Sequence, residues 1–136
     1  MNILPVKKKN TCKGVMNLKV TGKIKDDILV LYLEGELDHH SADATREAID
    51  NIMSRRRLKK VIFDLSELTF MDSSGISVFY GRYKSIMSLN GRAILVGINH
   101  KVKRFAEVAG LYRIFEVYQS EEEAIRAMEN GVPVSG

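Results

Sequence analysis

Residues 60–87, KVIFDLSELTFMDSSGISVFYGRYKSIM, change from one structural pattern to another within a few positions. The first part, KVIFDL (60–65), is short and almost entirely apolar, which is typical of a central strand covered on both faces. From Ile76 to Met87, apolar residues recur every three or four positions, which predicts a helix with one buried face. Between the two lies the polar segment MDSSG. The stretch therefore predicts a strand, a polar turn and a helix in succession.

The flanking sequence continues this alternation. Residues 17–24 alternate between polar and apolar, as an edge strand does, and branched and aliphatic residues at 28–35 predict a buried strand. The later patterns predict, in order, a helix capped by Ser41, a strand at 92–98, a helix at 101–110, a strand at 114–118 and a helix at 120–131. The order β-β-α-β-α-β-α-β-α predicts an α/β fold: a single domain with a mixed, mainly parallel sheet of about five strands and about four helices.

Length and composition agree with one domain. The chain has 136 residues, 45% of them hydrophobic and 28% charged, which is typical of a soluble globular protein. We expect a flexible lead-in at 1–16, the domain at 17–131 and a tail at 132–136. No apolar run approaches the roughly 18 residues that cross a bilayer, so we expect no membrane partner. The single cysteine, Cys12, cannot form an internal disulfide, which favours a cytoplasmic location.

The formal net charge of +4 is concentrated in residues 7–9 and in RRRLKK, from Arg55 to Lys60. Such a run raises the question of nucleic-acid binding. However, no aromatic residues are interleaved with it and no nucleic-acid-binding motif surrounds it. We therefore expect no nucleic-acid partner, and we interpret the run as the solvated C-terminal end of a helix, where cations interact favourably with the helix dipole.

Loops that lead from parallel strands into helices emerge at one edge of a sheet. Here that edge would gather residues 36–41, 69–75 and 98–101, which contain the residue types of a Ser-His-Asp triad. The G-x-S-x-G elbow of hydrolases is absent, and a triad needs a base within hydrogen-bond reach of the serine. Serine hydrolase is therefore the disfavoured alternative. We also predict no metal site, because the adjacent His39 and His40 are expected to diverge and no spaced ligand pair is present.

The serines at 73 and 74 have two possible explanations. Asp72 or Ser73 would cap the following helix, but one capping residue suffices. Gly75 costs a helix about 1 kcal/mol relative to alanine, so it needs a reason such as close approach by a partner. Surplus capping and a modified serine both stay open from the residues alone. A phosphoserine would be tolerated at a helix N-terminus and would disrupt a partner docked against it.

Three stretches together carry a resemblance: GELDHHSA (35–42), LTFMDSSGISVFYGRYK (68–84) and VKRFAEVAGLYRIF (102–115). They resemble the anti-sigma factor antagonists of the STAS domain family, and most of all the sporulation antagonists that act on the anti-sigma factor of sigma-F. The resemblance covers about residues 17–129. It does not explain the basic run or the two ends of the chain.

The resemblance implies a binding protein that is not an enzyme and needs no cofactor. Its unmodified form would bind an anti-sigma factor that is also a serine kinase, with ATP or ADP bound, and so free the sigma factor. The kinase would phosphorylate Ser73 to release the complex, and a PP2C-type phosphatase would restore the active form. Ser74 is not excluded as the acceptor. The alternative within the family is a STAS domain of another partner-switching pathway, such as the general stress response.

The same resemblance places the partner at the edge where Asp38, Asp72 and Ser73 meet, and on the exposed side of the following helix. The further residues expected there are Ser74, Gly75, Ser77, Gly81 and Arg82. We expect a monomer, because the surface positions show no long apolar stripe.

Overall fold

The computed structural model describes residues 2–6 and 17–131, with side chains from residue 17 onward. Its elements are β1 (Asn2–Val6), β2 (Leu18–Lys25), β3 (Ile28–Leu37), α1 (Ala42–Arg56), β4 (Lys60–Met71), α2 (Ser73–Ser88), β5 (Arg92–Val96), α3 (His100–Val108), α4 (Leu111–Ile114), β6 (Glu116–Tyr118) and α5 (Glu121–Glu129). The strands form one sheet in the order β1-β2-β3-β4-β5-β6. The pairs β1–β2 and β2–β3 are antiparallel, and the remaining pairs are parallel. The predicted α/β class with a mixed, mainly parallel sheet is confirmed.

The N-terminal strand differs from the prediction. Strands β2 to β6 are the five expected ones, but β1 adds a sixth, so the expectation of a flexible lead-in is wrong for residues 2–6. β1 pairs with β2 along Val20 to Ile24. Without it, β2 would be an edge strand with a row of unpaired backbone groups, and pairing satisfies them. The expectations for residues 7–16 and for the tail at 132–136 lie outside the described residues.

Two further differences concern element lengths. α4 is a single helical turn that follows Gly110, whose φ of +83° is a left-handed conformation suited to glycine. One turn is too short to produce a recognisable period, so the sequence predicted four helices and the described residues contain five. β4 extends six residues past the predicted strand end, to Met71, by pairing with β3. The predicted polar turn at 69–75 is therefore partly strand.

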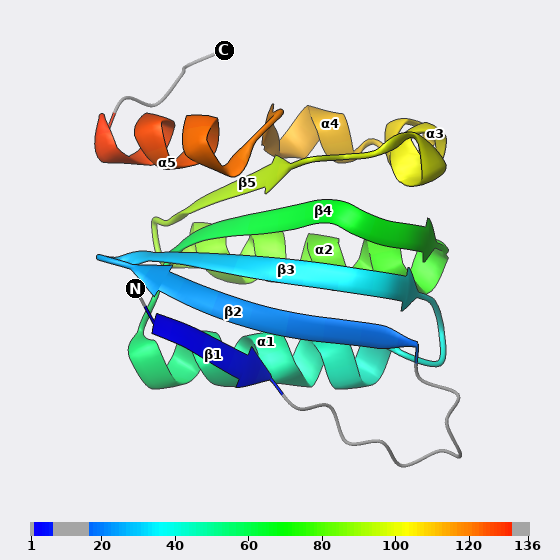
Figure 1. Cartoon of the computed structure of the whole chain (residues 1–136), viewed down its shortest axis with the longest axis horizontal. Helices are drawn as coiled ribbons and strands as arrows, with labels where there is room; N and C mark the ends of the chain where they lie inside the picture. The colour runs from blue at the N-terminus through cyan, green and yellow to red at the C-terminus, as the bar shows by residue number, and fades with distance from the viewer. Residues whose placement is uncertain (1, 7–16, 132–136) are drawn as a thin grey trace.

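The core lies on both faces of the sheet, and β3 shows how. Leu29 and Leu31 belong to the larger cluster with the buried faces of α1, α2 and α3, whereas Ile28 and Val30 belong to a smaller cluster with α5. Side chains alternate across a strand, so the two clusters occupy opposite faces. In Figure 1, α1 and α2 lie behind the sheet, and no helix crosses in front of β2 and β3.

The start of α5 forms hydrogen bonds with β2 and β3 on the face of the sheet that bears Ile28 and Val30. Lys23 Nζ and the Tyr32 hydroxyl each donate a hydrogen bond of 2.5 Å to the Glu121 carboxylate. Burial by itself raises the pKa of Glu121, but these two hydrogen bonds outweigh it and hold the pKa below the ordinary value of 4.5. The Glu121 carboxylate therefore joins α5 to both β2 and β3.

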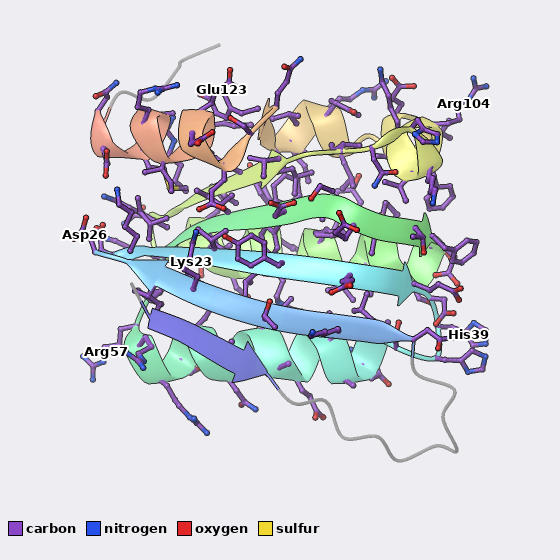
Figure 2. All side chains as sticks on the ribbon, in the orientation of Figure 1. Lys23, Asp26, His39, Arg57, Arg104 and Glu123 are labelled. Carbon is purple, nitrogen blue, oxygen red and sulfur yellow. The ribbon has the colours of Figure 1, made fainter. Side chains whose placement is uncertain are left out.

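The parallel strands β3, β4 and β5 all end at one edge of the sheet, where α1, α2 and α3 begin, at the right of Figure 1. Figure 2 shows His39 at this edge and Arg57 at the other end of the molecule. Arg55 and Arg56 are exposed in the last turn of α1, as predicted for the basic run, but the run continues past the helix to Lys60, the half-buried first residue of β4. No helix within residues 17–131 is long and apolar enough to cross a membrane.

Candidate functional site

Asp72 is the capping residue of α2. Its Oδ1 accepts hydrogen bonds from the backbone N–H groups of Ser74, at 2.8 Å, and Gly75, at 3.3 Å. Its Oδ2 accepts one from the backbone N–H of His39, at 3.2 Å. One carboxylate therefore satisfies two orphan donors of the helix and ties the loop after β3 to it. The question of whether Asp72 or Ser73 caps α2 is thereby answered.

Asp38 shapes the loop that joins β3 to α1. Its Oδ1 accepts hydrogen bonds from the backbone N–H groups of His40, at 2.9 Å, and Ser41, at 3.1 Å. Ser41 precedes α1 as predicted, but its hydroxyl makes no capping hydrogen bond and donates instead to the carbonyl of Glu36, at 2.8 Å. Asp38 is half-buried and lines a hollow with Asp72, while its carboxylate holds this turn.

The two serines have different surroundings. Ser73 is the first residue of α2 and is exposed. Within the described residues its hydroxyl makes no hydrogen bond, and only its carbonyl is used, by the Ser77 hydroxyl at 3.2 Å. Ser74 is half-buried and lines a hollow of about 350 Å³ between the starts of α1 and α2, together with His39, Arg46 and Ser77. Ser73 is thus the serine that the fold presents to solvent.

Gly75 is buried against the ends of β3 and β4. A Cβ atom at this position would lie 2.8 Å from the Leu37 carbonyl oxygen and 2.8 Å from Met71 Cγ. Real Cβ contacts are essentially never this short, so a side chain would force α2 outward. The close approach that explains this glycine comes from the chain itself, and a partner's approach is not needed to account for it.

The structure corrects the placement of Arg82. The sequence predicts it on the exposed side of α2 with Ser77 and Gly81, but Arg82 is only 6% exposed. Its Nε lies 2.9 Å from Asp50 Oδ1 on α1. Burial lowers the pKa of the guanidinium and Asp50 opposes that effect. The expectation that Arg82 is exposed is wrong, because Arg82 lies on the part of α2 that packs against α1.

The structure therefore brings together Asp38, Asp72, Ser73 and Ser74 at the edge of the sheet. Ser77 is exposed one turn along α2, and Gly81 is half-exposed one turn further, where a Cβ atom would have no neighbour within 4 Å. These six positions form a continuous surface that starts at the cap and runs along α2.

Four residues at this edge were not among the predicted site residues. The His39 and His40 rings lie 3.9 Å apart between centroids, so the expectation that they diverge is wrong. Asn99 caps α3 and donates to three carbonyl groups, including that of Leu68 at 2.8 Å, which fixes the end of β4. Its position just before the helix is the signal that would have identified it. Phe70 is 47% exposed, and nothing in the sequence around it indicates this exposure.

Enzyme chemistry gains no support from these contacts. In residues 17–131, no histidine hydrogen-bonds to Ser73, and His39 Nδ1 lies instead 3.8 Å from Asp72 Oδ2. The same part of the chain contains no group of three or more His, Cys, Asp or Glu residues placed to hold a metal ion. The arrangement is a capped helix start with an accessible hydroxyl group.

Comparison with known proteins assigns the fold and the class. The pattern of the STAS domain family matches residues 19–124. The chain belongs to the STAS domain family. It is 36% identical over 114 residues to the anti-sigma F factor antagonist of Paenibacillus polymyxa, which covers 84% of this chain and 97% of that protein. The anti-sigma-B factor antagonist of Listeria monocytogenes is 31% identical over 109 residues, covering 79% and 95% of the two chains.

A solved structure adds a third comparison. The Bacillus cell fate determinant SpoIIAA, in its phosphorylated form, superposes with a TM-score of 0.63 at 28% identity. The match covers 82% of this chain and 98% of SpoIIAA. With these relatives, the chain is an anti-sigma factor antagonist of the STAS type. The predicted family membership is confirmed.

Proposed function

We propose that the unmodified chain binds an anti-sigma factor that is also a serine kinase, and that phosphorylation of Ser73 switches this binding off. The observation that carries the proposal is that Asp72 and Ser73 have different roles at the start of α2. Asp72 alone caps α2, so the adjacent exposed hydroxyl has no structural task among the described residues. SpoIIAA, which has been solved in a phosphorylated form, supports the same interpretation.

The helix start tolerates the modification. A phosphoserine carries about −1.5 to −2 charges, and the N-terminus of a helix favours negative charge. The fold should therefore persist after phosphorylation. A partner packed against Ser73 would meet both the added bulk and the new charge, next to the carboxylates of Asp38 and Asp72. A loss of about 2.7 kcal/mol weakens binding about a hundredfold, which is enough for a switch.

The partner surface follows from the exposed groups around Ser73. Asp38 and Asp72 line one hollow at this edge, while Ser74 and Ser77 line the hollow between α1 and α2. Gly81 extends the surface along α2, and its lack of a side chain lets a partner approach the helix backbone closely. Arg82 takes part only indirectly, by holding α1 against α2.

The downstream factor we propose is sigma-F. The sporulation-type relative from Paenibacillus is 36% identical, compared with 31% for the sigma-B-type relative from Listeria. A side-by-side binding assay with a sigma-F-type and a sigma-B-type anti-sigma factor would distinguish the two pathways. The proposal also includes a cytoplasmic monomer and a PP2C-type phosphatase that removes the phosphate.

The test is incubation of the chain with the candidate kinase and ATP, followed by intact mass measurement and phosphosite mapping. We expect one phosphate on Ser73, absent from Ser73→Ala and retained in Ser74→Ala. The Ser74 variant is the matched control, because it removes the neighbouring hydroxyl and leaves the cap intact. Phosphate on Ser74 in the unchanged chain, or none with a kinase shown to be active, would contradict the proposal.

A further inference from the structure

The outer side of α3 combines exposed apolar and basic side chains. Val108 is 72% exposed and Phe105 is 37% exposed, although both are large and apolar. Lys101 and Arg104 are exposed on the same side of the helix, because Lys101 lies four residues before Phe105 and Arg104 lies four residues before Val108. We call these four residues the α3 flank. Figure 2 shows Arg104 projecting from α3 away from the sheet.

The cations of the α3 flank do not stabilise the fold. Lys101 lies in the first turn of α3, where the helix dipole disfavours positive charge and no acidic residue is present, and Arg104 lies at the middle of the helix. Within residues 17–131, neither Lys101 nor Arg104 forms an ion pair. Two exposed cations without ion pairs, one of them at the positive end of the helix, are explained better by an acidic partner than by stability.

The α3 flank is continuous with the edge that carries Ser73. Lys101 lines a hollow of about 710 Å³ together with Phe70, His39, Asp38 and Asp72. One end of this hollow is therefore the helix cap beside Ser73, and the other end is the first turn of α3. The two charge patterns are opposite, with carboxylates near Ser73 and cations on α3.

We infer that the α3 flank extends the partner surface and takes an acidic segment of the anti-sigma factor that carries an apolar side chain. This inference rests on the proposed function. The apolar contact would form on Phe105 and Val108, with partner carboxylates beside Lys101 and Arg104. Opposite charges at the two ends of one surface would fix the orientation in which the partner docks.

Two other occupants fit the surface less well. A second copy of the chain would bring the cations of two α3 flanks together, which is repulsive. An anionic membrane would need a wide apolar face, but the inner face of α3, with Val102 and Ala106, is already buried in the core. Two exposed apolar side chains suit a protein contact better than insertion into lipid.

The experiment measures the Kd of the full chain for the candidate anti-sigma factor by calorimetry, with ADP present. The test variant carries Lys101→Glu and Arg104→Glu. The matched control carries Arg55→Glu and Arg56→Glu, which change the net charge equally at the opposite end of the molecule. Glutamate at position 101 suits the dipole of α3 and position 104 is exposed, so the test variant should fold normally, as circular dichroism would verify.

We expect the α3 variant to bind about tenfold more weakly and to lose part of the salt dependence of binding, while the control stays within about twofold of the unchanged chain. A Ser73→Glu variant reports on the proposed function separately. If Ser73→Glu loses binding and the α3 variant does not, the inference is overturned and the proposed function stands. If the unchanged chain does not bind at all, the proposed function fails and the inference fails with it.

Discussion

Replacement of Gly75 by alanine tests how tightly the start of α2 packs against the sheet. The added Cβ would lie 2.8 Å from the Leu37 carbonyl oxygen, 2.8 Å from Met71 Cγ and 2.9 Å from Leu37 Cγ. Both neighbours are buried, and the carbonyl group also accepts a hydrogen bond from the backbone N–H of Asp72, at 3.3 Å. The contact therefore cannot be relieved by rotating one flexible side chain.

The magnitude follows from two opposing effects. Overpacking a core costs about 1–3 kcal/mol, whereas alanine in place of glycine gains a helix up to about 1 kcal/mol. We expect Gly75→Ala to lower the free energy of unfolding by about 1–2 kcal/mol, measured by urea denaturation.

Gly81→Ala provides the control in the same helix. No atom lies within 4 Å of its added Cβ, so only the gain in helix propensity applies. We expect this variant to be more stable than the unchanged chain by about 0.5–1 kcal/mol. A Gly75→Ala chain as stable as Gly81→Ala would refute the packing argument and would reopen close approach by a partner as the reason for the glycine.

Three further changes test the remaining contacts by urea denaturation. Asp72→Ala should cost about 1–2 kcal/mol through loss of the cap, with Asp72→Asn milder; equal stability would contradict the capping role. Asp50→Ala should cost about 1–3 kcal/mol by leaving the buried Arg82 guanidinium unpaired, and Arg82→Met should cost less; the reverse order would count against the pairing. Glu121 has a lowered folded-state pKa, so its stabilisation is present above about pH 4.5 and lost as the pH falls through the folded-state value. Glu121→Gln should therefore flatten the loss of stability as the pH falls below about 4.5, and an unchanged profile would show that Glu121 contributes nothing to that loss.

The sequence predicted the fold well where elements are long and periodic. The strand at 28–35, the central strand from residue 60 and the helix of Ile76 to Met87 were all recognisable, because each has a clear period of apolar residues. β1 was not, since NILPV is short and contains a proline. Its formation depends on pairing with β2, which is a tertiary effect.

The site was predictable in its location and less so in its details. Parallel topology placed Asp38, Asp72 and Ser73 at one edge, and the structure confirms that they meet there. The sequence does not decide between Asp72 and Ser73 as the cap, because both residue types cap helices well. Arg82 was misplaced because an arginine is normally exposed, and its burial depends on where α1 packs.

The central claim is that phosphorylation of Ser73 removes binding without unfolding the chain. The most direct test is a calorimetric comparison of the unmodified chain and the chain phosphorylated on Ser73, each titrated into the same anti-sigma factor, with circular dichroism of both forms. We predict identical spectra and a Kd about a hundredfold larger for the phosphorylated form. Equal Kd values for two folded forms would contradict the account.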